Sequence, residues 1–142
     1  MQIPDGYRKY KEQSINTMTD GEALILLFDE SIKSLTKARH LCYNKDYTGF
    51  EKEVTKTRTI ILELDKNLDK KYPISADLHK LYEYVTYELA RLLTNRKIDL
   101  LDQIMPFLVE LRDTWKEADR IVRHSNTDSN RGRINGQQSF RG

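Results

Sequence analysis

The sequence is poor in the residues that mark disulfide-stabilised and β-rich proteins. Its 142 residues include a single cysteine, Cys42, so no disulfide can form within the chain, and nothing indicates an oxidising compartment. Glycine (6) and proline (3) are scarce as well. Because Lys, Glu, Leu and Asp are abundant instead, the composition favours helices over strands. The length suits one domain with a sizeable core.

Long apolar runs are also missing. The longest extends from Ala23 to Phe28, far short of the about 20 residues that span a bilayer. Residues 1–18 lack the basic start and the apolar stretch of a secretory signal. We therefore expect a cytoplasmic protein without membrane insertion. The formal net charge of +2 is too small to indicate a nucleic-acid partner from composition.

Four segments repeat apolar residues at the spacing of an amphipathic helix. The pattern predicts helices over residues 19–43, 48–70, 76–95 and 99–124. The expected buried stripes are Leu24, Phe28, Ser31, Leu35, Ala38 and Cys42 in the first helix; Phe50, Val54, Thr57, Ile61, Leu64 and Leu68 in the second; Leu78, Tyr82, Val85, Leu89 and Leu92 in the third; and Leu101, Ile104, Leu108, Leu111, Trp115, Ala118 and Val122 in the fourth.

Capping signals precede three of these segments. Thr19 with Glu22, and Thr48 with Glu51, have the spacing of a capping box, in which each side chain accepts from a backbone N–H of the other residue. Ser75 is a suitable N-cap for the third segment. The sequence therefore places helix starts close to these residues.

Stop signals follow the helices, and one breaker lies inside the last. Asn44 and Asn95 can adopt the left-handed conformation that ends a helix. Pro106 interrupts the fourth segment, where a proline costs about 3 kcal/mol or more, so a kink or short break is expected. Because the apolar repeat continues on both sides of Pro106, the pattern still predicts one helix.

Short connections make consecutive helices antiparallel neighbours. The sequence therefore predicts an all-α fold, an antiparallel up-down-up-down four-helix bundle over residues 19–124, with a short N-terminal arm over residues 1–18. Residues 125–142 are rich in Ser, Asn, Gln, Gly and Arg. Such a segment cannot bury enough apolar surface to become ordered, so we expect a disordered C-terminal tail.

The residue types that carry catalysis are not arranged for it. None of the three histidines follows a Glu by three residues, so the ligand pattern of di-iron bundles is missing, and we expect neither metal nor cofactor. Cys42 is expected to be a small core thiol. The chain has no glycine-rich phosphate loop and no nucleophile elbow. We expect no enzyme.

Arg-Gly pairs in the last residues are typical of RNA-binding tails. No helix has a matching basic face, so we interpret the pairs as a solvated tail and expect no nucleic-acid partner.

Several apolar residues lie off the predicted stripes. Each alone is ordinary, because scattered apolar residues are common on surfaces. As a set they predict a groove for amphipathic partner helices. With the two arm tyrosines that could line one edge of a short helix, the expected partner-binding residues are Tyr7, Tyr10, Leu26, Leu62, Tyr84, Tyr87, Leu100 and Phe107.

Three strings in the first, third and fourth helices carry a family resemblance. In order and spacing they resemble the flagellin-specific export chaperones of bacterial flagella, the FliS family, over residues 7–123. Phe28, where the family usually has Tyr, and Pro106 depart from its pattern. The strings are Leu27-Phe28-Asp29-Glu30-Ser31-Ile32, Leu81-Tyr82-Glu83-Tyr84 and Glu110-Leu111-Arg112-Asp113-Thr114-Trp115-Lys116-Glu117-Ala118.

The resemblance implies a cytosolic chaperone that catalyses nothing. It would bind the C-terminal region of flagellin, which is disordered in the monomer, prevent premature polymerisation and keep the subunit competent for flagellar type III export. The family's N-terminal arm can cover part of the same surface, and Tyr7 and Tyr10 match that arm. The alternative for both tyrosines is permanent packing against the helix ends.

Further partners follow from the same resemblance. An export-gate component and flagellar regulators are expected besides flagellin, and the free protein is expected to be a monomer or a weak homodimer. The alternative function is a helical-bundle interaction module that dimerises or sequesters a flagellar regulatory protein.

Overall fold

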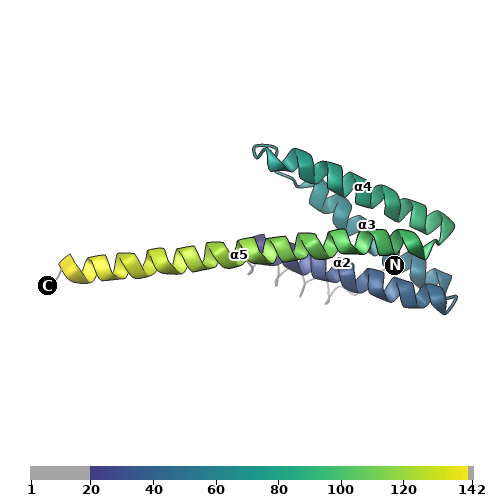
Figure 1. The fold of residues 1–142 in the computed structure, drawn as a ribbon, viewed down its shortest axis with the longest axis horizontal. Coiled ribbons are helices and arrows are strands. Elements are labelled where there is room, and N and C mark those ends of the chain that lie inside the picture. The colour runs from purple at the N-terminus through teal and green to yellow at the C-terminus, as the bar shows by residue number, and fades with distance from the viewer. Residues whose placement is uncertain (1–19, 141–142) are drawn as a thin grey trace, which may run out of the picture.

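Helices account for nearly all of the described chain. The computed structural model describes the backbone of residues 20–140 and the side chains of residues 21–122 and 124. Its elements are α2 (Asp20–Tyr43), α3 (Tyr47–Lys66), α4 (Ile74–Asn95) and α5 (Ile98–Phe140) (Figure 1), with no strand in this part of the chain. The predicted all-α fold of four antiparallel helices is confirmed. The arm, with Tyr7 and Tyr10, lies outside the described residues.

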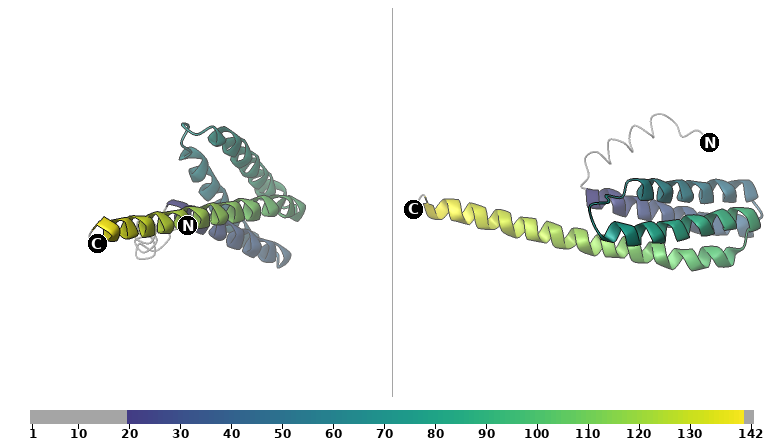
Figure 2. Two further views of the ribbon diagram at one scale, coloured as in Figure 1. Left: turned by 60° about the vertical axis from the view of Figure 1, so that its left-hand side comes forward. Right: turned by 90° about the horizontal axis from the view of Figure 1, so that it is seen from above.

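The four helices form a closed cycle of neighbours. Each packs against the next in sequence, and α5 also packs along α2. The helices fall into two pairs, α2 with α5 and α3 with α4, which separate toward the end where α3 passes to α4 (Figures 1 and 2). The pairing of α4 with α5 is the least extensive of the four contacts.

The core follows the predicted stripes. Burying a large apolar side chain contributes about 1.5–3 kcal/mol, so these residues supply most of the driving force for packing the helices. All of the largest fully buried side chains belong to those stripes: Phe28, Leu35, Phe50, Val54, Ile61, Tyr82, Val85, Leu89, Leu92, Leu101, Ile104 and Leu108.

Several residues depart from the stripe prediction. Half-buried rather than buried are Leu24, Leu68, Leu78, Trp115 and Ala118. Cys42 is only half-buried, at the edge of the core, and Val122 is exposed. Leu100, which was expected on the surface, is 7% exposed and belongs to the core. At 100° per residue, Leu100 lies on the same side of α5 as Leu111, which is also buried. The buried face of α5 is therefore wider than the predicted stripe.

The start of α3 differs from the predicted one. The N-cap is Asp46, whose Oδ1 accepts a hydrogen bond from the Gly49 amide at 3.0 Å, so the prediction that Thr48 caps this helix is wrong. A Cβ on Gly49 would lie 2.9 Å from Asp46 Oδ2 and 3.1 Å from Leu41 Cδ1. A larger residue at position 49 would therefore force the Asp46 carboxylate or the Leu41 side chain to shift. Lys45, not Asn44, takes the left-handed conformation, with φ 61°.

The segment between α3 and α4 is longer than predicted. α3 ends at Lys66, with Asn67 as its C-cap. α4 starts at Ile74 after Pro73, and no side chain caps it, so the prediction that Ser75 is the N-cap is wrong. Ser75 lies inside the first turn, and its hydroxyl donates to the Tyr72 carbonyl oxygen at 2.6 Å. At the other end α4 stops at Asn95 as predicted, and Arg96 takes the left-handed conformation.

α5 is one continuous helix through Pro106, as the sequence predicted. It runs on past the ends of the other three helices (Figures 1 and 2). The backbone stays helical to Phe140, past the helix end predicted at residue 124, and the predicted bounds of the arm, bundle and tail stay a prediction. Ser, Asn and Gly in this extension have low helix propensity, and an isolated helix of this length is marginal in water. The predicted disorder of residues 125–142 stays a prediction.

Candidate partner-binding surface

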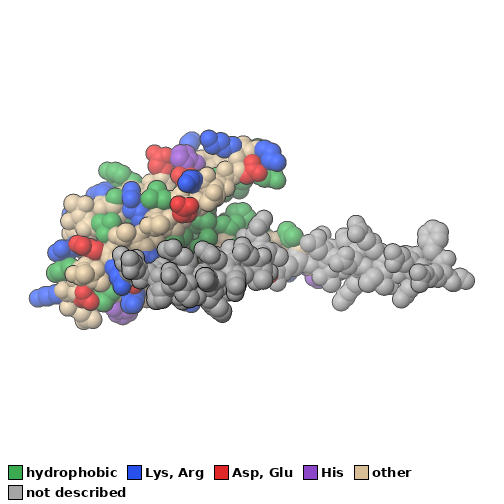
Figure 3. Space-filling view, turned by 180° about the vertical axis from the view of Figure 1, so that it is seen from behind, with side chains coloured by type: hydrophobic (Ala, Val, Ile, Leu, Met, Phe, Trp, Pro, Cys, Tyr) green, Lys and Arg blue, Asp and Glu red, His purple; other side chains and the backbone are tan. Residues whose placement is uncertain are grey.

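Apolar side chains of α2, α4, α5 and the segment after α3 are incompletely covered at one end of the bundle. We call this the open end and define it by residues that are half-buried and packed against the core. They are Leu24 and Leu27 of α2, Leu68 just after α3, Leu78 and Leu81 of α4, and Trp115 of α5. Seen from behind, hydrophobic side chains gather in the hollow where the two helix pairs separate (Figure 3).

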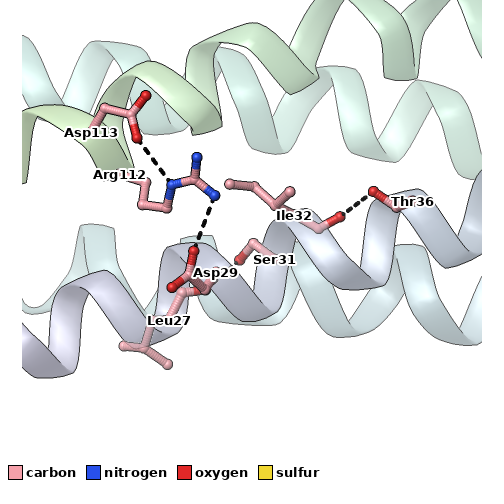
Figure 4. A network of polar contacts seen from close by, with 7 residues as sticks. All are labelled: Leu27, Asp29, Ser31, Ile32, Thr36, Arg112 and Asp113. Atoms are coloured by element: carbon pink, nitrogen blue, oxygen red, sulfur yellow. Dashed lines mark hydrogen bonds and ion pairs between the residues drawn. The ribbon is translucent and has the colours of Figure 1, made fainter. Parts of the chain in front are cut away.

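Ion pairs hold each helix pair together close to the open end. Arg112 Nη1 of α5 lies 3.2 Å from Asp29 Oδ1 of α2, and its Nε lies 3.2 Å from Asp113 Oδ1 (Figure 4). The bond to Asp113 and then the bond to Asp29 raise the pKa of Arg112, so its charge is permanent. His79 Nδ1 of α4 lies 2.7 Å from Asp65 Oδ1 of α3. Polar contacts thus join the two helices of each pair near the open end, and the one at His79 is an ion pair only when the imidazole is protonated.

Contacts between the two pairs lie farther from the open end. Lys37 Nζ of α2 lies 3.6 Å from Glu53 Oε1 of α3. Between α4 and α5, the rings of Tyr84 and Phe107 meet edge to face, with centroids 5.6 Å apart and an interplanar angle of 75°. Both rings remain partly on the surface, at 39% and 38% exposure. They form an apolar surface that spans two helices.

An open surface, which we call the outer face of α5, extends along that helix from Pro106 to Ile121. Four of its described lining residues are apolar, three are acidic and one is Thr114. Arg120 donates from Nη2 to Glu117 Oε1 at 2.6 Å, and this bond lowers the pKa of Glu117. The lining residues are Pro106, Val109, Glu110, Asp113, Thr114, Glu117, Ala118 and Ile121.

The expected partner-binding residues are not gathered in one place. Tyr84 and Phe107 are in contact, and Tyr87 is exposed one turn farther along α4. Leu62 is exposed on α3, and Leu26 is half-buried on α2. Leu100 is in the core and is removed from the surface set.

The open end could not be found from the periodicity. Leu24, Leu68, Leu78 and Trp115 belong to predicted stripes, so the pattern assigns them to the core. Their half-burial comes from the separation of the two helix pairs, which periodicity does not report. The sequence signal for the open end was Pro73, which shows that the chain leaves the helical conformation between α3 and α4.

Among the described residues, no group of three or more His, Cys, Asp or Glu side chains is placed to hold a metal ion. Burial raises the pKa of Tyr82 to about 12, with a smaller contribution from Asp65, so this core phenol stays neutral. The arrangement offers apolar area with charged margins, which suits binding.

Comparison with known proteins agrees with this architecture. The sequence model of the family described as "Flagellar protein FliS" matches residues 3–122. This chain belongs to the FliS family. Membership places the protein among the flagellar export chaperones.

Two FliS-like proteins show how far the similarity extends. The flagellar secretion chaperone FliS of Bacillus subtilis (strain 168) is 27% identical over 118 residues, which are 83% of this chain and 89% of that protein. A crystal structure of a bacterial flagellar chaperone has a TM-score of 0.69 at 19% identity, covering 81% of this chain and 95% of that one. The second likeness bears on the fold alone. No described helix has the length and apolar character needed to cross a membrane.

Proposed function

We propose that this FliS-family protein binds the disordered C-terminal region of flagellin in the cytoplasm, prevents its premature polymerisation and keeps it competent for type III export. The observation that supports the proposal is the open end, where apolar side chains of α2, α4, α5 and the segment after α3 are packed against the core yet remain partly exposed. A disordered client needs apolar surface that it can cover while it folds.

The energetics favour an extended contact. Ordering a disordered segment costs about 2–5 kcal/mol of the gross interaction, so a small contact would give little net affinity. The open end and the Tyr84–Phe107 pair lie at different levels of the bundle, and a client that covered both would gain more apolar contact than at either alone. The client would lie over them as short helices with extended links.

Residues 1–18 belong to the same proposal. An arm that covers part of the surface lowers the apparent affinity for the client by the fraction of time it is closed. Tyr7 and Tyr10 are the residues that would contact the surface. An export-gate component would then compete for the client at release, and the free protein would be a monomer or a weak homodimer.

Titration calorimetry with a flagellin C-terminal segment tests the proposal. Ile74→Asp places a charge at the first residue of α4, beside the open end, and Tyr43→Lys places one at the last residue of α2, at the opposite end of the bundle. Ile74 and Tyr43 are similarly exposed, at 61% and 68%. Both changes suit the helix dipole, so neither should unfold the protein. We expect Ile74→Asp to weaken binding and Tyr43→Lys to leave it unchanged.

Two results would contradict the proposal. Absence of heat with the wild-type chain would remove flagellin as the client. Equal affinities for the two variants would remove the open end as its site. Formation of a stable dimer without flagellin binding, measured by light scattering, would favour the alternative of a module that dimerises or sequesters a flagellar regulator.

A further inference from the structure

We propose that the α3–α4 pair pivots as one unit against the α2–α5 pair, so that the open end widens and narrows, and that a client seated there fixes the angle between the pairs. The pivot lies at the opposite end of the bundle, where the pairs stay together. The pivot itself is a property of the free chain, whereas its use in client binding rests on the proposed function.

Within residues 20–140, the chain joins the two pairs at one end of the bundle. It crosses from one pair to the other twice, between α2 and α3 at residues 44–46 and between α4 and α5 at residues 96–97. Both crossings lie opposite the open end, whereas the segment between α3 and α4 stays within one pair (Figure 1). The pairs therefore have the connectivity of two arms that share one joined end.

Polar contacts tie α2 to α5 at two levels. Arg39 of α2 bonds to Asp102 of α5 in the half of the pair that lies away from the open end. Arg112 of α5 bonds to Asp29 of α2 close to the open end. The two levels are about ten residues apart on each helix, which is about 15 Å. Because the helices are tied at both levels and pack along one another, we expect them to move together.

The α3–α4 pair is tied in the same way. Arg58 Nε of α3 donates to the Thr86 carbonyl oxygen of α4 at 3.2 Å. Nearer the open end, His79 Nδ1 of α4 lies 2.7 Å from Asp65 Oδ1 of α3. The segment between the helices adds a covalent link at that end. This pair is therefore also expected to move as one unit.

Two contacts between the pairs lie away from the open end. Lys37 of α2 pairs with Glu53 of α3, and the rings of Tyr84 and Phe107 meet about halfway along α4. The pairing of α4 with α5 is the least extensive of the four helix contacts. The pairs are thus held together most firmly near the end where the chain also joins them, which leaves rotation about that end as the least restrained motion.

Widening the open end costs less than separating the pairs at the opposite end. Leu24 of α2 and Leu78 of α4 are already half-buried, so opening exposes only the rest of their apolar area to water. At the opposite end, Phe50 and Leu89 are fully buried, and separation there would expose their whole side chains. Because the cost is proportional to the apolar area exposed, the open end is the end that yields.

A small rotation has a large effect at the open end. The 22 residues of α4 make a lever of about 33 Å at 1.5 Å per residue. A rotation of about 10° about the joined end would move the first turn of α4 by about 6 Å. This displacement is large enough to change the room available to a client segment.

Pulsed electron paramagnetic resonance on the full spin-labelled chain measures this motion. In a Cys42→Ser background, which removes the native thiol, labels at Ala76→Cys and Lys116→Cys report the distance between α4 and α5 at the open end. Both positions are exposed. In the free chain we expect this distance distribution to be several ångströms broader than the distributions of two control pairs, as the lever length requires.

The control pairs separate the pivot from label motion. Ala76→Cys with Glu63→Cys reports on the open end within the α3–α4 pair. Tyr43→Cys with Thr94→Cys reports on the distance between the pairs at the opposite end. These positions are exposed as well. An open-end distribution between the pairs that is no broader than both controls would overturn the inference.

Removal of the ring contact gives a second readout. Phe107→Ala should broaden the open-end distribution further, because Tyr84 then loses the ring that it meets on α5. Tyr72→Ala removes an exposed ring from the segment within the α3–α4 pair and should leave the distribution unchanged. If Phe107→Ala also leaves it unchanged, the breadth does not come from motion of α4 against α5, and the inference fails.

The flagellin C-terminal segment separates this inference from the proposed function. If the segment binds and narrows the open-end distribution, the pivot serves client binding. If the segment binds without changing that distribution, the inference fails while the chaperone function stands. If the segment does not bind at all, the proposed function fails, and the distributions of the free chains still decide whether the pairs pivot.

Discussion

The two ends of the bundle are built from the same kind of helix and are covered to different extents. At the end where α2 passes to α3 and α4 passes to α5, which we call the closed end, the half-buried apolar residues are Leu41, Cys42, Leu93 and Ile98. Behind them other apolar residues are fully buried. They include Leu35 and Ala38 of α2, Phe50 and Val54 of α3, Leu89 and Leu92 of α4, and Leu101 and Ile104 of α5. At the open end the corresponding residues, such as Leu24, Leu78 and Trp115, are half-buried.

The connections between the helices account for this difference. At the closed end, short turns through Lys45 and Arg96, both left-handed, keep the helices close together. At the open end, α3 stops at Lys66, and the seven residues to Pro73 lie outside any helix. The pairs separate there (Figure 1). The closed end thus contributes most of the packing, and the open end leaves apolar surface that a client would cover under the proposed function.

The largest predicted effect compares two leucines of α4. Leu89 is fully buried, whereas Leu78 is half-buried at the open end. Leu89→Ala should lower the free energy of unfolding by about 2–5 kcal/mol, because it leaves a cavity in a close-packed core. Leu78→Ala should cost about 1 kcal/mol, because its side chain keeps contact with water. Urea denaturation measures both, and equal losses would show that the two ends do not differ in packing.

The second prediction concerns Pro106, which lies inside α5. Pro106→Ala restores an N–H that can donate to the Asp102 carbonyl oxygen four residues earlier. Since α5 is already helical at this position, we expect an increase in stability of up to about 3 kcal/mol. Thermal unfolding followed by circular dichroism gives the result. A loss of stability would mean that the bundle requires the local shape that the proline imposes.

Periodicity predicted the core because the buried face of a helix must carry an apolar residue every three or four positions. Phe28, Leu35, Tyr82 and Leu101 were placed by it without any knowledge of the partner helices. The bounds were less secure. Asp46 and Thr48 are both suitable N-cap residues for α3. Asp46 is the cap because its carboxylate accepts from the Gly49 amide, and residue preferences alone do not distinguish the two.

The surface was harder to predict for a different reason. Whether Leu100 or Phe107 faces solvent depends on how close α4 lies to α5, and that distance is a tertiary property. Leu100 is covered, whereas Phe107 is covered only in part, where Tyr84 reaches it. A residue outside the predicted stripe is away from the centre of the buried face, but it can still be buried by a neighbouring helix, as Leu100 is.

The third prediction tests whether the Tyr84–Phe107 pair links α4 to α5. A double-mutant cycle with Tyr84→Ala and Phe107→Ala should give a coupling energy of about 0.5–1.5 kcal/mol, the usual value of an edge-to-face pair beyond its buried area. Additive losses would show that the two rings act independently. Tyr87→Ala with Phe107→Ala is the control, since Tyr87 is the more exposed tyrosine one turn away.

The smallest effect is expected at His79, which ties α4 to α3 beside the open end. The hydrogen bond and the charge of Asp65, with a smaller contribution from Glu83, raise the pKa of His79, against opposing contributions from desolvation and Lys70. A raised folded-state pKa means that protonated His79 stabilises the fold. This stability is fully present below the unfolded pKa of about 6.5 and is lost as the pH rises through the higher folded value.

His79→Gln should remove that dependence. The melting temperature of the wild-type chain should exceed that of the variant at about pH 5.5, and the difference should shrink by about pH 8.5. His40→Gln, at another exposed histidine, controls for the loss of an imidazole. Because His79 is largely in water, where ion pairs are weak, the shift should be small. A difference that grows with pH would mean that neutral, not charged, His79 holds the two helices together at the open end.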